Sequence, residues 1–529
     1  MRARSPWGNS GTVPSCPDNP FDVQTGGARS PLSPARWLVW LALPLLYFAY
    51  CYRLTATGVI LPDEPRYASV ARAMADTGDV VTPRLWGEPW FEKPALYYWM
   101  AALAFRFGAG PDLAPRLPVA LLSVAFLLFF YWILRREFGW RAAAFAALIL
   151  ATSGEWLLYS QVGVTDLPMS ATFAAAMLLA IPWVSRGDQK WLPWSGAMFG
   201  LAILAKGLVP VALALPLLLG VRNRFPRALA RLLLPCILVT APWYAACYLK
   251  NGAAFLLDFF WKHHVERAFT GALLHSQPFW YYFPVLLLAL VPWTPLAALA
   301  ATRFRTPDIR QRFLFAWAIW GLLFFSVPVN KLPGYVLPLL PPVAALAGVA
   351  LNESAAGRTV GSFWLAGCAL LMAAFPVLGP MLPEAIAWGS SKAPVPAFRW
   401  TWLLPVLAAG LVWLLDSRGL RLAAVFVIAG GVTLNIVDWK IAVLPEVDRI
   451  ASARPIWKRI APVAGQVCVD NIHRNWRYGL NYYTVTPLPE CSVRDRPLHV
   501  QQIPGQPPQL TPVDPLANHI VPSQFQVIP

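Results

Sequence analysis

The stretch Leu61–Met100, LPDEPRYASVARAMADTGDVVTPRLWGEPWFEKPALYYWM, brings charged and aromatic side chains together between two strongly apolar segments. Charges so close to a membrane are costly unless they face water, a partner or a substrate. Apolar side chains recur at helical spacing over Tyr67–Met74, Gly78 then ends the helix, and Thr82 opens an extended segment. The stretch therefore predicts a folded loop along a membrane surface. A plainer alternative stays open, in which the charges merely mark the boundary with water.

The chain as a whole has the composition of a membrane protein with many spans. Of its 529 residues, 57% are hydrophobic and 13% are charged, which excludes an ordinary soluble domain. The net charge of +17 would fit a nucleic-acid partner, but the Arg and Lys residues lie mainly in short loops between apolar runs. The seven cysteines show no metal-ligand spacing. The polar, Pro- and Gly-rich segment 1–36 predicts a disordered cytoplasmic tail without a cleavable signal.

Apolar runs of about 20 residues, or fewer where flanking side chains reach the interface, predict about thirteen transmembrane helices within 37–438. The predicted spans are 37–53, 116–134, 141–156, 168–184, 192–206, 208–221, 231–249, 279–301, 313–329, 336–351, 361–382, 400–416 and 421–438. The apolar run 95–107 is short, and we expect it to form a juxtamembrane helix that closes the first outer loop, 54–115. With a cytoplasmic N-terminus, the Arg-rich loops then all fall on the inner side. The segments placed outside the cytoplasm are 54–115, 250–278, 330–335 and everything after 438.

Four further side chains on the predicted outer side are unusual for their surroundings. Asp166 follows an apolar run at the mouth of a helix pair, and Lys206 interrupts the apolar stretch LAILAKGLVP. A buried lysine in a membrane is rare and usually faces an anion, although snorkelling to the surface is the alternative. Lys331 and Tyr335 stand together in NKLPGYVLPLLPP, where Tyr335 either closes over a bound group or anchors the interface.

The end of the chain is more polar and predicts a small α/β domain over 439–529 with a Pro-rich end. Gln466–Asp470 is β-like, and Pro504–Pro529 is expected to be unstructured. Cys468 and Cys491 are the two cysteines of this domain, which the charge pattern places in an oxidising compartment. We predict a disulfide between them if their segments pair as neighbouring strands. Two unpaired buried thiols are the alternative.

The predicted outer face gathers cations and carboxylates, namely Arg66, Lys93, Lys206 and Lys331 with Asp63, Glu92 and Asp166. Arginine offers a forked contact and lysine a point charge to a lipid-linked phosphate, and both stabilise a phosphate leaving group. A carboxylate takes a proton from an acceptor hydroxyl or steadies positive charge on a sugar ring. Together these groups suit transfer of a sugar from a polyprenyl phosphate to an acceptor outside the cytoplasm.

The first outer loop resembles that of membrane glycosyltransferases with the GT-C fold. The likeness rests on DEPRY at 63–67, GD at 78–79, FEKP at 91–94 and YW at 98–99. It is strongest to the lipid A aminoarabinose transferases and the galacturonosyl transferases of lipopolysaccharide, and weaker to the protein O-mannosyltransferases. Shorter likenesses, which extend the resemblance over roughly 40–350, are TDLP at 165–168, AKG at 205–207, HSQPFWYY at 275–282 and KLPGYVLP at 331–338.

The resemblance implies a fold and a set of roles. The fold is an all-α polytopic GT-C domain, with Asp63 at the reaction centre. Glu92 is implied to hold a divalent metal ion with His264, or with the neighbouring His263; a structural ion or plain hydrogen bonding is the alternative. The complete prediction assigns catalysis to Asp63, Glu64 and Lys93, donor-phosphate binding to Arg66, Lys93, Lys206, Lys331 and Tyr335, and further site roles to Tyr67 and Asp166.

These predictions describe a multi-pass glycosyltransferase of the bacterial inner membrane, whose donor is a polyprenyl-phosphate sugar such as aminoarabinose and which has no nucleic-acid partner. Lipid A, another lipopolysaccharide sugar, and a secreted glycan or protein are all acceptors that the sequence allows, because its C-terminal segment departs from the aminoarabinose transferases. A lipid or solute transporter would use the same charged outer site, but needs such residues at mid-helix and in both halves. A non-catalytic subunit is a third class, against which the joint presence of Asp63, Arg66 and Lys93 argues.

Overall fold

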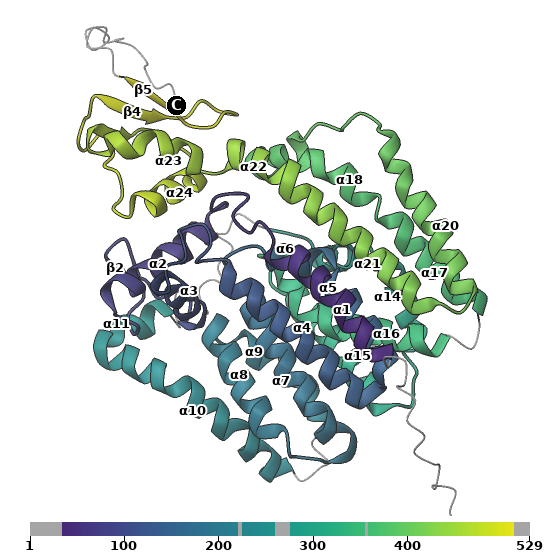
Figure 1. Ribbon diagram of the computed structural model, residues 1–529. Helices are drawn as coiled ribbons and strands as arrows, with labels where there is room; N and C mark the ends of the chain where they lie inside the picture. The colour runs from purple at the N-terminus through teal and green to yellow at the C-terminus, as the bar shows by residue number, and fades with distance from the viewer. Residues whose placement is uncertain (1–33, 221–224, 260–275, 355–357, 513–529) are drawn as a thin grey trace, which may run out of the picture. The chain divides into compact units, whose positions relative to one another are not determined.

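The computed structural model describes residues 34–220, 225–259, 276–354 and 358–512, and these are mostly helical (Figure 1). Contacts divide the chain into an N-terminal unit, Met1–Pro44, and the remainder, Leu45–Pro529. Of the first unit the structure describes the start of α1 (Pro34–Leu46). The predicted N-terminal tail therefore lies almost entirely outside the described residues.

Most helices of the second unit belong to the apolar region, where η marks a 3₁₀ or π helix. They are η1 (Tyr47–Cys51), α4 (Leu117–Phe138), α5 (Trp140–Ala151), α6 (Gly154–Tyr159), α7 (Asp166–Arg186), α8 (Leu192–Lys206), α9 (Val209–Leu213), η2 (Leu215–Gly220), α10 (Phe225–Asn251), α11 (Ala253–Leu256), η4 (Phe279–Tyr281), α13 (Tyr282–Ala289), α14 (Thr294–Ala301), α15 (Ile309–Ser326), η5 (Pro333–Leu339), α16 (Leu340–Glu353), α17 (Arg358–Leu371), α18 (Ala374–Leu378), η7 (Gly379–Met381), α19 (Leu382–Trp388), η8 (Ser390–Lys392), η9 (Trp400–Leu403), α20 (Leu404–Ser417) and α21 (Arg421–Asp438).

Seven helical segments among the described residues are long and apolar enough to cross a membrane, or eight if one bent pair is a single span. The polytopic all-α fold is thereby confirmed, whereas the count of about thirteen stays a prediction. The predicted span 279–301 is that bent pair: α14 turns by 112° away from the helix before it. Pro292 stands in the break, and because proline lacks an N–H group it cannot continue the ladder of helical hydrogen bonds. The predicted span 208–221 is likewise divided, into α9 and η2.

Helix α7 lies at the centre of this region, since its apolar window is buried along its whole length. It packs against α8, which in turn packs against α10 (Figure 1). Two glycines of α8 make the second contact close: a Cβ at Gly196 would stand 2.1 Å from the carbonyl oxygen of Leu232, and one at Gly200 would stand 2.7 Å from Val239 Cβ. Small residues that let helix backbones approach are typical of packing within membranes.

The first outer loop folds as the sequence predicts. Helix α2 (Asp63–Thr77) buries one apolar face and ends at Gly78, whose φ of 75° lies in the left-handed region that glycine adopts without strain. A two-stranded hairpin, β1 (Arg84–Leu85) with β2 (Glu88–Pro89), follows. Helix α3 (Leu96–Arg106) has 11 residues. At 1.5 Å per residue it spans roughly 16 Å, about half the hydrocarbon core, which agrees with the predicted juxtamembrane helix.

No loop separates the last apolar helix from the C-terminal domain, because α21 continues through η10 (Trp439–Val443) into α22 (Leu444–Ala451). The domain then contains α23 (Arg454–Ile460), η11 (Ala461–Gln466), β3 (Val467–Val469), α24 (Arg474–Thr484), β4 (Leu498–Gln501) and β5 (Gln509–Pro512). Its sheet has the order β3-β4-β5, parallel between the first two strands and antiparallel between the last two. Figure 1 labels the antiparallel pair β4 and β5. The predicted α/β character is confirmed.

Two predictions for this domain have opposite outcomes. The disulfide Cys468–Cys491 is present, with Cα atoms 5.0 Å apart, and the predicted strand pairing occurs as a parallel bridge between Val469 and Glu490. The expectation that everything from Pro504 onward is unstructured is wrong for Gln509–Pro512, which forms β5. Proline is tolerated there because Pro512 stands at the end of an edge strand.

Candidate active site

The N-terminus of α2 carries two adjacent carboxylates in opposite environments. The Asp63 side chain is 44% exposed. Glu64 is completely buried, and its carboxylate receives Arg116 Nε at 2.7 Å and Arg116 Nη2 at 2.8 Å. The backbone N–H groups of Ile60 and Gly163 donate to the same carboxylate at 3.0 and 2.9 Å. Both Glu64 oxygens are therefore occupied by the protein itself, while Asp63 is open to a substrate.

Arg116 extends this buried pair into a clamp on the start of the loop. Its guanidinium also donates to the carbonyl oxygens of Leu54, Thr57 and Gly58. A paired and fully hydrogen-bonded ion pair of this kind fixes a backbone geometry, and loss of one partner is strongly destabilising. Both Glu64 oxygens accept hydrogen bonds, which suits a residue that positions the start of α2, and its predicted catalytic role stays a prediction.

Arg66 connects Asp63 to the second half of the loop. It donates to the Asp63 carboxylate through Nη2, to Glu92 Oε2 through Nη1 at 3.1 Å, and to the carbonyl oxygen of Pro62 through Nε at 3.0 Å. An arginine has five N–H groups, so two have no partner among the described residues. Burial opposes the charge of Arg66, but Glu92 and then Asp63 favour it, so that its pKa is raised. The guanidinium can therefore offer two charged donors to a phosphate.

Aromatic rings enclose Arg66 on several sides. Its Cζ lies 5.9 Å from the ring centre of Tyr67, 5.6 Å from Trp90 and 5.5 Å from Tyr478. Burial, followed by the negative charge of Glu92, raises the pKa of both Tyr67 and Tyr98 well above the ordinary value, so both remain neutral hydroxyls. The Tyr98 hydroxyl and the Trp90 indole N–H are buried without a hydrogen-bond partner in the described part of the chain. Unpaired buried donors are costly, and both groups have a hydrogen bond available for an acceptor.

Glu92 and Lys93 form the far side of this network. Lys93 Nζ lies 3.3 Å from Glu92 Oε1, so Glu92 bridges Lys93 and Arg66. The Lys93 side chain is largely buried. The ammonium group has further donors with which it can meet an anion. The predicted grouping of Asp63, Arg66, Glu92 and Lys93 is thus realised in space.

A second charged pair comes from the ends of two neighbouring helices. Asp166 begins α7 and Lys206 ends α8, and their side chains meet with Nζ 2.6 Å from Oδ1. The ammonium group also lies 4.7 Å from the ring centre of Tyr335, which favours a role for Tyr335 beside the site over one as an interface anchor alone. Lys206 is mostly buried and paired, so it does not snorkel to the surface.

Gly163 connects the charged cluster around Asp63 with the Asp166–Lys206 pair. This residue lies three positions before Asp166, and its N–H group donates to Glu64 under Asp63. A Cβ at Gly163 would stand 2.6 Å from the Tyr97 hydroxyl and 2.8 Å from Pro115 Cβ, so only glycine fits. The loop that leads to Asp166 is therefore held against the start of α2.

The structure separates two predicted residues from this arrangement. Lys331 is buried, and its Nζ donates to the backbone carbonyl oxygens of Gln277 and Pro328. It has no contact with a carboxylate in the described residues, so its donor-phosphate role stays a prediction. His264 and His263 lie outside the described residues.

The described residues do not build a metal site around Glu92. The Glu92 carboxylate is paired with two cations, Arg66 and Lys93. Because His264 lies outside the described residues, the predicted metal site of Glu92 and His264 stays a prediction. The one metal-like group found among the described residues is Cys468, Cys491 and His499, and its cysteines are joined in the disulfide. A thiolate is the form of cysteine that ligates metals, so this group does not qualify.

The C-terminal domain contacts the charged cluster of the first outer loop. The sequence did not predict this contact. Tyr478 of α24 covers Arg66 and lies 5.5 Å from the Trp86 ring, between ring centres. The Tyr483 hydroxyl donates to Asp112 Oδ1 at 2.6 Å and accepts from the Val59 N–H at 3.1 Å. Arg454 adds ion pairs with Asp112 and Asp448. The aromatic segment NWRYGLNYY was the available signal, but nothing in its spacing indicates a partner some 400 residues earlier.

Comparisons with known proteins show which proteins this chain is similar to. Residues 92–245 match the family Dolichyl-phosphate-mannose-protein mannosyltransferase. The chain is 32% identical to undecaprenyl phosphate-alpha-4-amino-4-deoxy-L-arabinose arabinosyl transferase 2 of Pseudomonas fluorescens over 374 residues, 67% of this chain and 62% of the relative. The enzyme of the same name from Pseudomonas aeruginosa is 34% identical over 323 residues, 58% of each chain. The chain thus spans about three fifths of the length of the curated relatives it matches.

Solved structures extend the likeness to most of the chain. The crystal structure of ArnT from Cupriavidus metallidurans bound to undecaprenyl phosphate superposes with a TM-score of 0.70 at 26% identity, covering 89% of this chain and 87% of that one. Its apo state gives a TM-score of 0.66, with coverage of 89% and 86%. The GT-C fold and the resemblance to the aminoarabinose transferases are thereby confirmed.

Proposed function

We propose that this chain, a multi-span membrane protein with the fold and sequence likeness of the aminoarabinose transferases, moves a sugar from a polyprenyl phosphate to an acceptor at the outer face of the bacterial inner membrane. The relatives' names support undecaprenyl phosphate-linked aminoarabinose as the donor. The resemblance of the first loop implies lipid A, or another lipopolysaccharide sugar, as the acceptor.

One observation carries the proposal. Asp63 is the exposed carboxylate of a network whose other members are held, and Arg66 beside it keeps donors free. Lys93 lies on the far side of Glu92, and Lys206 stands above Tyr335 at the end of α8. An open carboxylate beside several cations fits a reaction in which a phosphate leaves with negative charge.

In the proposed reaction each group has one role. The acceptor hydroxyl attacks the anomeric carbon of the donor sugar and gives its proton to Asp63, which acts as a general base. The new bond joins the acceptor oxygen to that carbon, and the bond from the carbon to the phosphate oxygen breaks. The lipid phosphate leaves with the electron pair of that bond. Arg66, Lys93 and Lys206 stabilise its growing charge, and the neutral Tyr67 and Tyr98 hydroxyls donate hydrogen bonds without competing for the proton.

The experiment uses the full chain in lipid nanodiscs with a radiolabelled undecaprenyl-phosphate aminosugar and lipid A. We expect labelled lipid A and released undecaprenyl phosphate in equal amounts. A parallel assay in sealed vesicles follows movement of the labelled lipid between leaflets. Movement without any transfer, to lipid A or to other lipopolysaccharide sugars, would overturn the proposal in favour of a transporter.

A further inference from the structure

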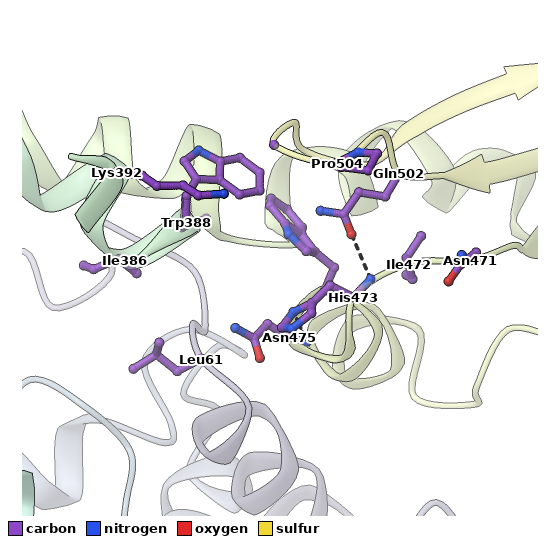
Figure 2. A pocket seen from close by; sticks show the side chains of 14 residues that line it. Leu61, Ile386, Trp388, Lys392, Asn471, Ile472, His473, Asn475, Gln502 and Pro504 are labelled. Atoms are coloured by element: carbon purple, nitrogen blue, oxygen red, sulfur yellow. Dashed lines mark hydrogen bonds between the residues drawn. The ribbon is translucent and has the colours of Figure 1, made fainter. Parts of the chain in front are cut away.

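A cavity of about 440 Å³ lies between the C-terminal domain and the end of α19 with η8. Figure 2 shows Trp388 and Lys392 on one side of it, with His473, Asn475 and Gln502 of the C-terminal domain across from them. Leu61, two positions before Asp63, also lines the cavity. The cavity therefore borders the residues that lead directly into the start of α2.

The lining has the chemistry of a saccharide site. Trp388 is half-buried and offers a flat apolar face, against which the C–H face of a sugar ring can pack, while the buried Trp476 forms part of the floor. Asn471 and Asn475 offer side-chain amides that make no hydrogen bond within the described residues, so both can pair with hydroxyl groups. Gln502 is held in place, since it accepts from the His473 N–H at 2.8 Å and donates to the Gln506 carbonyl (Figure 2).

The charge of the lining points to a phosphorylated sugar. Lys392 is exposed and makes no ion pair in the described part of the chain, and none of the described residues that line the cavity is Asp or Glu. A single unpaired ammonium group in an otherwise neutral polar cavity suits one phosphate. The cations proposed for the donor phosphate, Arg66, Lys93 and Lys206, do not line it. The cavity is thus left for the second substrate.

We propose that this cavity binds the head group of the acceptor, a phosphorylated sugar, with Lys392 on a phosphate and Trp388 against a sugar ring. The inference rests on the proposed function, since it locates the acceptor of that same reaction. It also predicts binding without turnover, and this separates its own test from that of the transfer.

The test compares Lys392→Gln with Lys458→Gln in the full chain in nanodiscs. Lys458 is an exposed lysine of α23 that does not line the cavity, so it controls for general loss of positive charge. We expect Lys392→Gln to raise KM for bis-phosphorylated lipid A about tenfold, the lower end expected for one charge-assisted hydrogen bond. KM for the donor lipid and kcat stay at wild-type values. With fully dephosphorylated lipid A, the variant and the wild type are equal.

A second variant and a second readout keep the inference falsifiable. Trp388→Ala should weaken both acceptor forms, whereas Trp413→Ala, at an exposed position on α20, should weaken neither. Equilibrium binding of radiolabelled lipid A without donor should show the same order. Unchanged binding and KM in both Lys392→Gln and Trp388→Ala would overturn the acceptor site. Lys392-dependent binding in a wild-type protein that transfers no sugar would support the site and overturn the proposed function instead.

Discussion

Neighbouring residues in this chain have separate tasks, and Asp63 with Glu64 is the clearest case. One helical step turns Asp63 toward the exposed side of α2 and Glu64 into the interior, where Arg116 and two backbone N–H groups receive it. The sequence DE alone cannot separate these tasks. The separation depends on Arg116, which is 52 residues away along the chain.

At Asp63 we expect Asp63→Asn to abolish sugar transfer while leaving expression and the thermal unfolding midpoint unchanged. The amide keeps the shape of the side chain and its contact with Arg66 but cannot accept the proton of the acceptor hydroxyl. Asp76→Asn, at an exposed position on the same helix, is the matched control and should retain full activity. Wild-type turnover in Asp63→Asn would show that the loop is only a charged boundary.

At Glu64 we expect the reverse result, a loss of stability that precedes any effect on chemistry. Glu64→Gln leaves the Arg116 charge buried without a counter-ion, which costs about 3–5 kcal/mol. The midpoint of thermal unfolding in detergent measures the loss. Glu88→Gln, on the exposed strand β2, should leave the midpoint in place. A stable but inactive Glu64→Gln protein would support the predicted catalytic role of Glu64.

At the scale of elements, α24 places the Tyr478 ring against the Arg66 guanidinium. Tyr478→Ala should lower kcat/KM for the donor roughly 2- to 30-fold, the range expected for loss of one cation–π contact. Tyr478→Phe keeps the ring face and should remain near wild type. Kinetics at varied donor concentration decide the matter. If Tyr478→Ala has wild-type kinetics, α24 contributes nothing to catalysis.

Elements that depend on local pattern were predictable, and contacts between distant elements were not. The helical periodicity of Tyr67–Met74, the end of α2 at Gly78 and the short α3 follow from residues that stand near one another in the sequence. The disulfide follows from the two cysteines of one small domain. Lys206 could be recognised as unusual, but its partner Asp166 could not, because the pair depends on how α7 lies against α8. Tyr478 stands in the aromatic segment NWRYGLNYY, but that segment does not indicate Arg66 as a partner, since an aromatic side chain on an amphipathic helix usually packs into its own domain.

At the scale of the whole molecule, the contact between the first outer loop and the C-terminal domain constrains the topology. Because Tyr483 and Asp112 touch, both regions lie on the same side of the membrane, and an even number of crossings separates them. This holds whatever the total number of spans. The alternation of Arg-rich loops predicts that this side faces away from the cytoplasm.

Reporter fusions test that orientation. We expect a fusion at Gly357 to report the cytoplasm and one at Gly505 to report the periplasm, because the intervening helices cross an odd number of times in the predicted topology. An enzymatic reporter that is active only in the periplasm gives the readout. Reporters on the same side at both positions would contradict the arrangement.

Two hydrogen bonds of the first outer loop can form only late in synthesis. They join Val59 to Tyr483, 424 residues apart, and Gly58 to Asp448, 390 residues apart. At a rate of synthesis of about 5–20 residues per second, roughly 20–80 s pass between the synthesis of the loop and that of the C-terminal segment that contacts it. We therefore expect a nascent chain to consume no donor lipid until the residues up to Tyr483 have been exported. Pulse-labelled chains should show protease cleavage near Asp112 that disappears only after release from the ribosome; protection before release would mean that the loop matures unaided.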